Sequence, residues 1–378
     1  MPNFKVPNGK LNPNAVYTFI YNMILNQQVT SKNVSLEYAK LLNEAKEDTG
    51  MYGDQKLYYD TYMPPITDWL GDDESTDLLE TKKYRPKSPE CQALVINIYK
   101  KCVLVLDKYL TKNAWMNEAA FSDFTSIMMG WIRDVKDVYE MDTYNAFIGS
   151  EESSVGKQQI ELDISAVIGA ATGEEANRLE ASAIAKSQVD LIGDLMDNTT
   201  DYTDYGAEGM IRGFAKDDFR IVMPLSIANK LTKLGEPTIF HKEGLLEKVE
   251  VLPDRFFAKV NTTATAGNGT TVRSRFYQNV PTTATKDKPA DEQVLKAVKA
   301  GGLIPIDCTA PANTSVTVDD TILYKVIHKK SVPFISSFEA SESFFNAQAL
   351  NTKYVTVIGH NTLEHLAGKP IITVRKKA

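Results

Sequence analysis

The sequence has little cysteine and no long apolar run. Its three cysteines, Cys91, Cys102 and Cys308, are an odd number without any C-x-x-C spacing. This pattern argues against a disulfide framework and against a zinc knuckle, and we expect buried free thiols. No stretch reaches the roughly 20 apolar residues that a bilayer span needs, and the first residues lack the basic-then-apolar order of a secretory signal. We therefore expect a cytosolic chain without membrane contact.

An excess of positive charge is missing as well. The formal net charge is -7, whereas tight binding to nucleic-acid phosphates needs clustered Lys and Arg. We expect no sequence-specific binding to nucleic acid, although mild acidity is compatible with enclosing DNA. The length of 378 residues and the hydrophobic content of 43% are typical of a globular protein with two domains, or with one core that carries extensions.

Recognisable catalytic motifs are also missing. In "GSEESSVGKQQ", Gly149 precedes Gly156 by seven residues instead of five, and Gln158 stands where a phosphate loop needs Ser or Thr. His360 and His365 are five residues apart, which is the wrong spacing for two metal ligands on one helical face. We predict no catalytic residue, no cofactor and no metal site, and we interpret the histidines as structural.

Extended chain is predicted for residues 54 to 113. The run "CQALVINIYKKCVLVLDKYL" alternates apolar side chains, and Lys100 and Lys101 lack the Asn-Gly or Asp-Gly chemistry of a tight turn. We therefore predict one long strand in place of a hairpin. At about 3.3 Å per residue, a strand of about 18 residues spans on the order of 60 Å, so it should project as an arm.

Helical patterns precede and follow this extended region. Two of them lie between residues 14 and 48. In "NEAAFSDFTSIMMGWIRDVKDVYEMDTYNAFIG", apolar residues recur at steps of three and four, which predicts a helix over 117–148 with Asn117 as N-cap and Trp131 buried. A further helix is predicted over 174–197.

The rest of the chain mixes both kinds of element. A strand from Phe219 to Met223 should run into a helix with Pro224 in its first turn. Residues 261–289 are rich in Thr, Gly and Asn, which favours a surface loop, and the last 26 residues favour two strands joined by a loop. Because no β-α-β rhythm repeats, the predicted class is α+β.

Residues 71 to 90, "GDDESTDLLETKKYRPKSPE", place an acidic block beside a basic block with little apolar material between them. An extended arm that lies on a neighbouring subunit has little core of its own, and complementary charge would help to set its register. The alternative is a solvated hairpin with ordinary surface charges.

The order of these parts resembles that of tailed-bacteriophage major capsid proteins with the Hong Kong ninety-seven fold, most closely those of small podoviruses and related phages. The stretches that carry the resemblance are "MYGDQKLYYDTYM", "RPKSPECQALVINIYKKCVLVLDKYLTKNAW", "FSDFTSIMMGWIRDVKDVYEMDTYNAFIG" and "FFNAQALNTKYVTVIGHNTLEHLAGKPIITVRKK". It is most specific from Lys108 through the long helix and weakest over 240–320, a region to which we assign no function.

The resemblance implies a division of the chain into four parts. These are an N-terminal arm (1–48), an E-loop (49–113), a peripheral domain (114–173 and 345–378, with its spine helix at 117–148) and an axial domain (174–344). It also implies that the E-loop contacts a neighbouring subunit. The candidate contact residues are Tyr58, Tyr59, Tyr62, Trp69, Asp72, Asp73, Glu74, Asp77, Glu80, Lys82, Lys83, Arg85 and Lys87.

The implied function is that of a major capsid protein and not of an enzyme. Such a chain assembles as hexamers and pentamers into an icosahedral head that encloses double-stranded DNA, with scaffold, portal and decoration proteins as further implied partners. It would be located in the virion after assembly in the host cytoplasm. We expect assembly to rely on a separate scaffold or on partner proteins, and not on a cleaved N-terminal extension.

Two alternatives remain. The first is a nanocompartment shell protein of the same fold, which cargo-binding features would favour. The second is a soluble metal-dependent enzyme whose site gathers acidic residues such as Asp201 and Asp204, which a small oligomeric state and a copurifying metal would favour.

Overall fold

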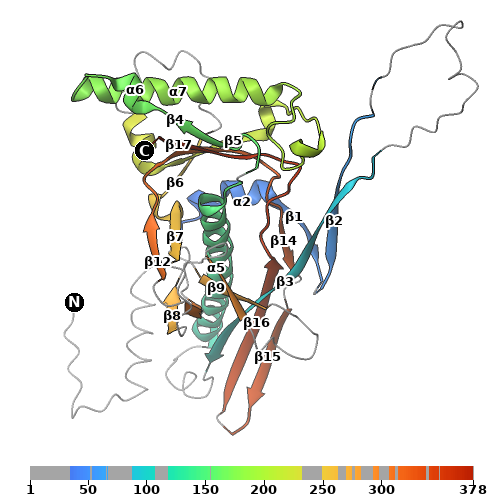
Figure 1. Cartoon of the computed structure of the whole chain (residues 1–378). Helices are drawn as coiled ribbons and strands as arrows, with labels where there is room; N and C mark the ends of the chain where they lie inside the picture. The colour runs from blue at the N-terminus through green and yellow to red at the C-terminus, as the bar shows by residue number, and fades with distance from the viewer. Residues whose placement is uncertain are drawn as a thin grey trace, which may run out of the picture.

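The computed structural model describes most of the chain from residue 35 onward (Figure 1). The described residues are 35–51, 53–64, 66, 87–106, 118–153, 155–231, 249–262, 270–274, 277–281, 293–297, 306–310, 314–337, 340–348 and 350–377. They form helices and several separate sheets, which confirms the predicted α+β class. Within this part of the chain, no helix combines the length and the apolar composition that a membrane crossing requires.

A six-stranded sheet joins the N-terminal part of the chain to its C-terminal part. From the N-terminal part come η2 (Glu37–Ala39), α2 (Lys40–Ala45), β1 (Lys46–Gly50), β2 (Gln55–Asp60) and β3 (Glu90–Leu106). The later strands are β14 (Phe334–Ser337), β15 (Ala340–Asn346) and β16 (Asn351–Asn361). The strand order is β1-β14-β16-β3-β2, with β15 paired to β16.

Strand β3 is one continuous strand of 17 residues, as predicted. It changes its partner along its length. Its first residues pair with β2, from Glu90 opposite Asp60 to Val95 opposite Gln55. From Ile96 onward it pairs with β16 in the body of the molecule. The two ladders explain how so long a strand is held, and only its first part stands out as an arm (Figure 1).

The long helix α5 (Glu118–Ser150) matches the predicted helix to within two residues at each end. Its last turns are buried, and Tyr144 and Phe147 pack in one cluster with Leu42 of α2 and Phe334 of β14. Trp131, however, is 49% exposed, so the prediction that it is buried was wrong. The periodic apolar pattern does predict one apolar face of the helix, and the core of the chain covers that face from Val138 to Ile148, but at Trp131 the side chain is left half exposed.

The second large sheet of the structure has five strands. Its strand order is β4 (Gln159–Leu162), β17 (Ile371–Lys376), β13 (Ile322–His328), β5 (Phe219–Pro224) and β6 (Val249–Leu252). Helices α6 (Ile164–Ile168) and α7 (Glu174–Met196) lie across it at the top of Figure 1. A helix at 225–231 follows β5 directly, as predicted, but Pro224 is the last residue of β5 and does not lie in the first turn of the helix. The two C-terminal strands β16 and β17 confirm the prediction for the end of the chain.

The Thr-rich region is more regular than predicted. The strands there are β7 (Ala258–Thr262), β8 (Thr270–Ser274), β9 (Tyr277–Pro281), β10 (Gln293–Ala297), β11 (Ile306–Ala310) and β12 (Thr314–Val318). They pair in nested order, β7 with β12, β8 with β11 and β9 with β10. The prediction of a loop over 261–289 was therefore wrong for β8, β9 and the end of β7, because β-branched Thr favours strands once a partner is available later in the chain.

Candidate assembly surface

The arm consists of β2 with residues 61–63 and the start of β3 with residues 87–89, and its two faces differ. Side chains alternate between the faces of a strand. Lys56, Tyr58 and Asp60 of β2 point to the inner face, toward the body of the same chain, and are half-buried. Leu57 and Tyr59 point to the opposite, outer face. The neighbouring residues Tyr58 and Tyr59 therefore lie on opposite faces, Tyr58 half-buried and Tyr59 exposed.

The inner face is anchored by both polar and apolar contacts. The Tyr58 hydroxyl donates a hydrogen bond of 2.7 Å to Glu47 Oε2, and Lys56 forms an ion pair with the same carboxylate. Burial acts to raise the pKa of Glu47, but these two partners outweigh it and hold that pKa below its ordinary value. Gln92 donates to the carbonyl of His365 at 2.8 Å and accepts from the amide of Ala367 at 3.1 Å.

An apolar cluster completes this anchor. Leu94 and Ile96 of β3 are buried against Ile335 of β14 and Leu366 of the loop before β17. Tyr58 packs at the edge of the same cluster. The base of the arm is therefore part of the core of its own chain. Leu94 and Ile96 of β3 lie in this core, and Tyr58 of β2 lies at its edge.

The outer face is apolar and uncovered. Leu57 is 47% exposed and Tyr59 is 60% exposed. Their cross-strand partners, Ala93 and Cys91, are exposed as well. Met63, just beyond β2, is 63% exposed. The exposure of Cys91 contradicts the expectation that the free thiols are buried.

A second apolar surface lies on the far part of the six-stranded sheet. Val103 and Val105 of β3 and Phe344 of β15 are exposed on one face, since Val105 and Phe344 are both paired with Lys353 of β16. Phe345 is exposed on the opposite face. Every residue of β15 is exposed to solvent. Exposed apolar side chains that share one face of a sheet make this face a candidate contact surface for another protein.

The structure describes four of the predicted contact residues. Tyr59 lies on the exposed outer face, Tyr62 and Lys87 lie at the outer end of the arm, and Tyr58 makes its contacts inside the chain. The remaining predicted contacts lie outside the described residues: Trp69, Asp72, Asp73, Glu74, Asp77, Glu80, Lys82, Lys83 and Arg85. For the four described and the nine other residues alike, an intersubunit contact stays a prediction.

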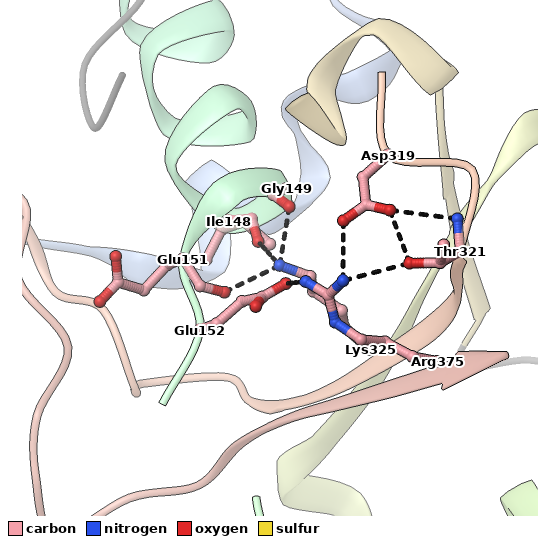
Figure 2. A network of polar contacts seen from close by, with 8 residues as sticks. All are labelled: Ile148, Gly149, Glu151, Glu152, Asp319, Thr321, Lys325 and Arg375. Carbon is pink, nitrogen blue, oxygen red and sulfur yellow. Dashed lines mark hydrogen bonds and ion pairs between the residues drawn. The ribbon is translucent and has the colours of Figure 1, made fainter. Parts of the chain in front are cut away.

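A buried lysine that the sequence analysis missed joins α5 to the five-stranded sheet (Figure 2). Lys325 of β13 is 0% exposed, and its Nζ donates to the carbonyl oxygens of Ile148, Gly149 and Glu151 at 3.2, 2.7 and 2.8 Å. The last carbonyls of a helix lack partners within the helix, and a cation is favoured at that end. Burial lowers the pKa of Lys325 to about 8, although the nearby Glu152 acts in the opposite direction.

A second cation, Arg375 of β17, completes this junction. It pairs with Glu152, which follows α5, and its Nη1 lies 2.8 Å from Asp319 Oδ2. Asp319 also accepts from the amide and hydroxyl of Thr321. Burial acts to raise the pKa of Asp319, but the Thr321 hydrogen bonds and Arg375 outweigh it and lower that pKa. Figure 2 shows the two cations side by side, so α5 and the sheet are fastened as one unit.

His360 has a structural environment, as the sequence suggested. It is buried in β16, its ring is stacked on Phe334, and its Nδ1 donates to the Asn361 carbonyl at 2.8 Å. Its Nε2 then accepts from the Tyr139 hydroxyl at 2.9 Å, which places the proton of the neutral ring on Nδ1. Burial lowers the pKa of His360 to about 4, so the ring is neutral at physiological pH.

The acidic residues proposed for the enzyme alternative have protein partners instead. Asp201 forms an ion pair with Lys157 at 2.6 Å. Asp204 accepts hydrogen bonds from Ser153 and Gln158 at 2.8 and 2.6 Å. In the part of the chain that the structure describes, no group of three or more His, Cys, Asp or Glu side chains could hold a metal ion.

Comparison with known proteins gives similarity in structure only. No family model matches the chain, and no curated protein matches it in sequence. A chain in the capsid structure of Staphylococcus phage Andhra is 11% identical, with 100% of this chain and 89% of that chain covered and a TM-score of 0.62. A chain in the structure of the head fiber and inner core protein gp22 of bacteriophage P68 is 12% identical, with 92% and 87% covered and a TM-score of 0.56.

These matches extend over nearly the whole of each chain, so they concern the arrangement of all the elements and not one motif. At such low identity they establish a shared fold. The long strand with its arm, the long helix and the two sheets therefore form an α+β fold of the Hong Kong ninety-seven type, as predicted.

Proposed function

We propose that this chain is a major capsid protein, the structural subunit of an icosahedral phage head. The observation that carries the proposal is the exposed apolar outer face of the arm, in a chain whose fold is shared with the Andhra capsid structure. A subunit that functions by assembly needs such surfaces, and a neighbour would cover them. Burying an apolar side chain of this size stabilises a contact by about 1 to 2 kcal/mol.

The proposal includes a division of the chain into four parts. Residues 1–48 form the N-terminal arm and 49–113 the E-loop. Residues 114–173 and 345–378 form the peripheral domain, and 174–344 form the axial domain. Under this division, Lys325 of the axial domain donates to the end of the spine helix and so links the axial domain to the peripheral domain.

The partners follow from the same proposal. The chain forms hexamers and pentamers, encloses double-stranded DNA without reading its sequence, and acts with scaffold, portal and decoration proteins. It is located in the virion after assembly in the host cytoplasm, and it has no enzymatic activity. The mild negative net charge of -7 suits a shell that contains DNA without binding it tightly.

Electron microscopy of the concentrated protein tests this function. We expect closed shells or capsomer rings from the wild type, and none from Leu57→Ser with Tyr59→Ser, which removes the apolar groups of the outer face. Tyr58→Phe is the matched control, because it alters the neighbouring residue on the inner face only, and it should still assemble. Both variants should retain the circular dichroism spectrum of the folded chain.

Three results would contradict the proposal. A small soluble oligomer that carries a bound metal would favour the enzyme alternative. Normal shells from the Leu57 and Tyr59 double variant would show that the outer face of the arm is not an assembly surface. Shells that contain protein cargo in place of DNA would favour the nanocompartment alternative.

A further inference from the structure

The outer end of the arm touches a second part of its own chain, the segment 206–212 between α7 and β5. The Tyr62 hydroxyl lies 2.6 Å from Glu208 Oε2 and 3.0 Å from Glu90 Oε1. A phenol carries one hydrogen, so it donates to one of these carboxylates at a time. Tyr62 therefore connects an acidic residue of β3 with an acidic residue of the body.

Lys87 reinforces the same contact from the other strand of the arm. Its Nζ donates to the Glu208 carbonyl at 3.0 Å and lies 3.6 Å from Glu208 Oε2. It also sits 3.9 Å from the centre of the Tyr62 ring, within the range of a cation–π contact. The hydrogen bond from Tyr62, supported by Lys87, holds the pKa of Glu208 below its ordinary value.

A second bridge lies one step closer to the base of the arm. Arg212 Nη2 is 2.9 Å from Asp60 Oδ1, at the last paired residue of β2. The Asp60 carboxylate also lies against Gly368, where any larger side chain would collide with it. Glycine at this position allows the carboxylate to approach the loop before β17 and still reach Arg212.

These contacts differ in kind from the anchor at the base of the arm. The anchor buries Leu94 and Ile96 in an apolar cluster. At the outer end, the side chains of Lys87 and Glu208 are each half exposed, and those of Arg212 and Asp60 are each 28% exposed. Exposed polar contacts form and break far more readily than buried apolar ones. The arm can therefore open at its outer end while its base stays in place, with β3 pivoting where it changes its partner at Ile96.

We propose that segment 206–212 is an intramolecular latch that sets the direction of the arm in the free subunit. Glu208 and Arg212 hold the outer end of the arm, and the latch opens without unfolding the body. The occupant of the latch is the chain's own arm, so the inference does not depend on the proposed function.

Hydrogen–deuterium exchange of the unassembled full-length chain tests the latch. In Tyr62→Phe with Lys87→Gln, we expect amides of residues 55–60 to exchange about three- to fivefold faster, because fraying at the end of the ladder is no longer opposed. Amides of β5 and β13 should not change. Lys157→Gln is the matched control, because it removes an exposed ion pair with Asp201 that does not touch the arm.

A charge exchange provides the second measurement. Glu208→Lys alone faces Lys87 with a like charge and should also accelerate exchange over 55–60, and adding Lys87→Glu should slow it again. The proposal would be overturned if exchange over 55–60 were unchanged both in Tyr62→Phe with Lys87→Gln and in Glu208→Lys. Acceleration of β5 and β13 to the same extent as β2 would also overturn it, because that result indicates global destabilisation.

Discussion

Replacing Lys325 with Met should lower the free energy of unfolding by about 3 kcal/mol. The Lys325 ammonium is fully buried and donates to three carbonyl oxygens at the end of α5. Methionine has a similar length but no donor, so it fills the space and leaves these oxygens without this partner. Each buried acceptor left unsatisfied costs about 1 to 3 kcal/mol, and relief from burying a charge offsets part of the sum.

Urea unfolding of the unassembled chain, followed by circular dichroism, measures this difference. Lys377→Met is the matched control, because Lys377 pairs with Asp163 at the surface and both side chains are largely exposed. The control should unfold at nearly the wild-type urea concentration. Equal stability of Lys325→Met and the control would refute the argument that Lys325 fastens α5 to the sheet.

The pH dependence gives an independent check on Lys325. The folded chain releases this proton at about pH 8, whereas the unfolded chain keeps it to about pH 10.4. Between pH 8 and 10 the unfolded state therefore binds more protons, and this group makes the wild type more stable as the pH rises, by up to about 1.4 kcal/mol per pH unit. Lys325→Met should lack that slope. An identical slope in the two proteins would show that Lys325 is not the titrating group.

Two further measurements follow from the buried and exposed rings. As the pH falls from 6.5 to about 4, the folded state keeps His360 neutral while the unfolded state binds a proton, so this group costs up to about 3 kcal/mol of stability. His360→Phe should lose that part of the slope in acid titrations. His328, whose pKa burial also lowers to about 4, and carboxylates such as Glu47, whose pKa lies below its ordinary value, should keep contributing to the slope. Trp131→Ala should shift the melting temperature little, well short of the ~3 to 5 kcal/mol typical of a buried tryptophan, and a large shift in differential scanning calorimetry would contradict the observed exposure.

Local periodicity predicted the long elements well. The alternation in "CQALVINIYKKCVLVL" and the three-and-four spacing before Gly149 each arise from residues that are neighbours in the chain. Such signals do not depend on which surface covers the element. For the same reason they could not show that Trp131 is half exposed, since the spacing marks the apolar face of a helix but not which part of that face the chain itself covers.

The contacts that the sequence did not predict depend on distant partners. Lys325 reaches carbonyls that lie 174 to 177 residues earlier in the chain. One signal was available, because a single lysine interrupts the otherwise apolar run "ILYKVIH", and a continuous apolar strand is typical of a sheet that is buried on both faces. Tyr58 and Tyr59 show the same limit: alternation predicts that they face opposite sides, but not which side is covered.

The balance between the latch and the outer face determines how the arm responds to a neighbour. The latch consists of polar contacts that water can replace at small cost, because Lys87 and Glu208 are half exposed. The outer face exposes Leu57, Tyr59 and Met63 to water. Burying these apolar side chains is favourable, because water cannot replace the contacts that they would make. If the chain assembles as we propose, a neighbouring subunit that covers the outer face draws the arm away from Glu208. The apolar base at Leu94 and Ile96 keeps the arm attached to its own subunit during that movement.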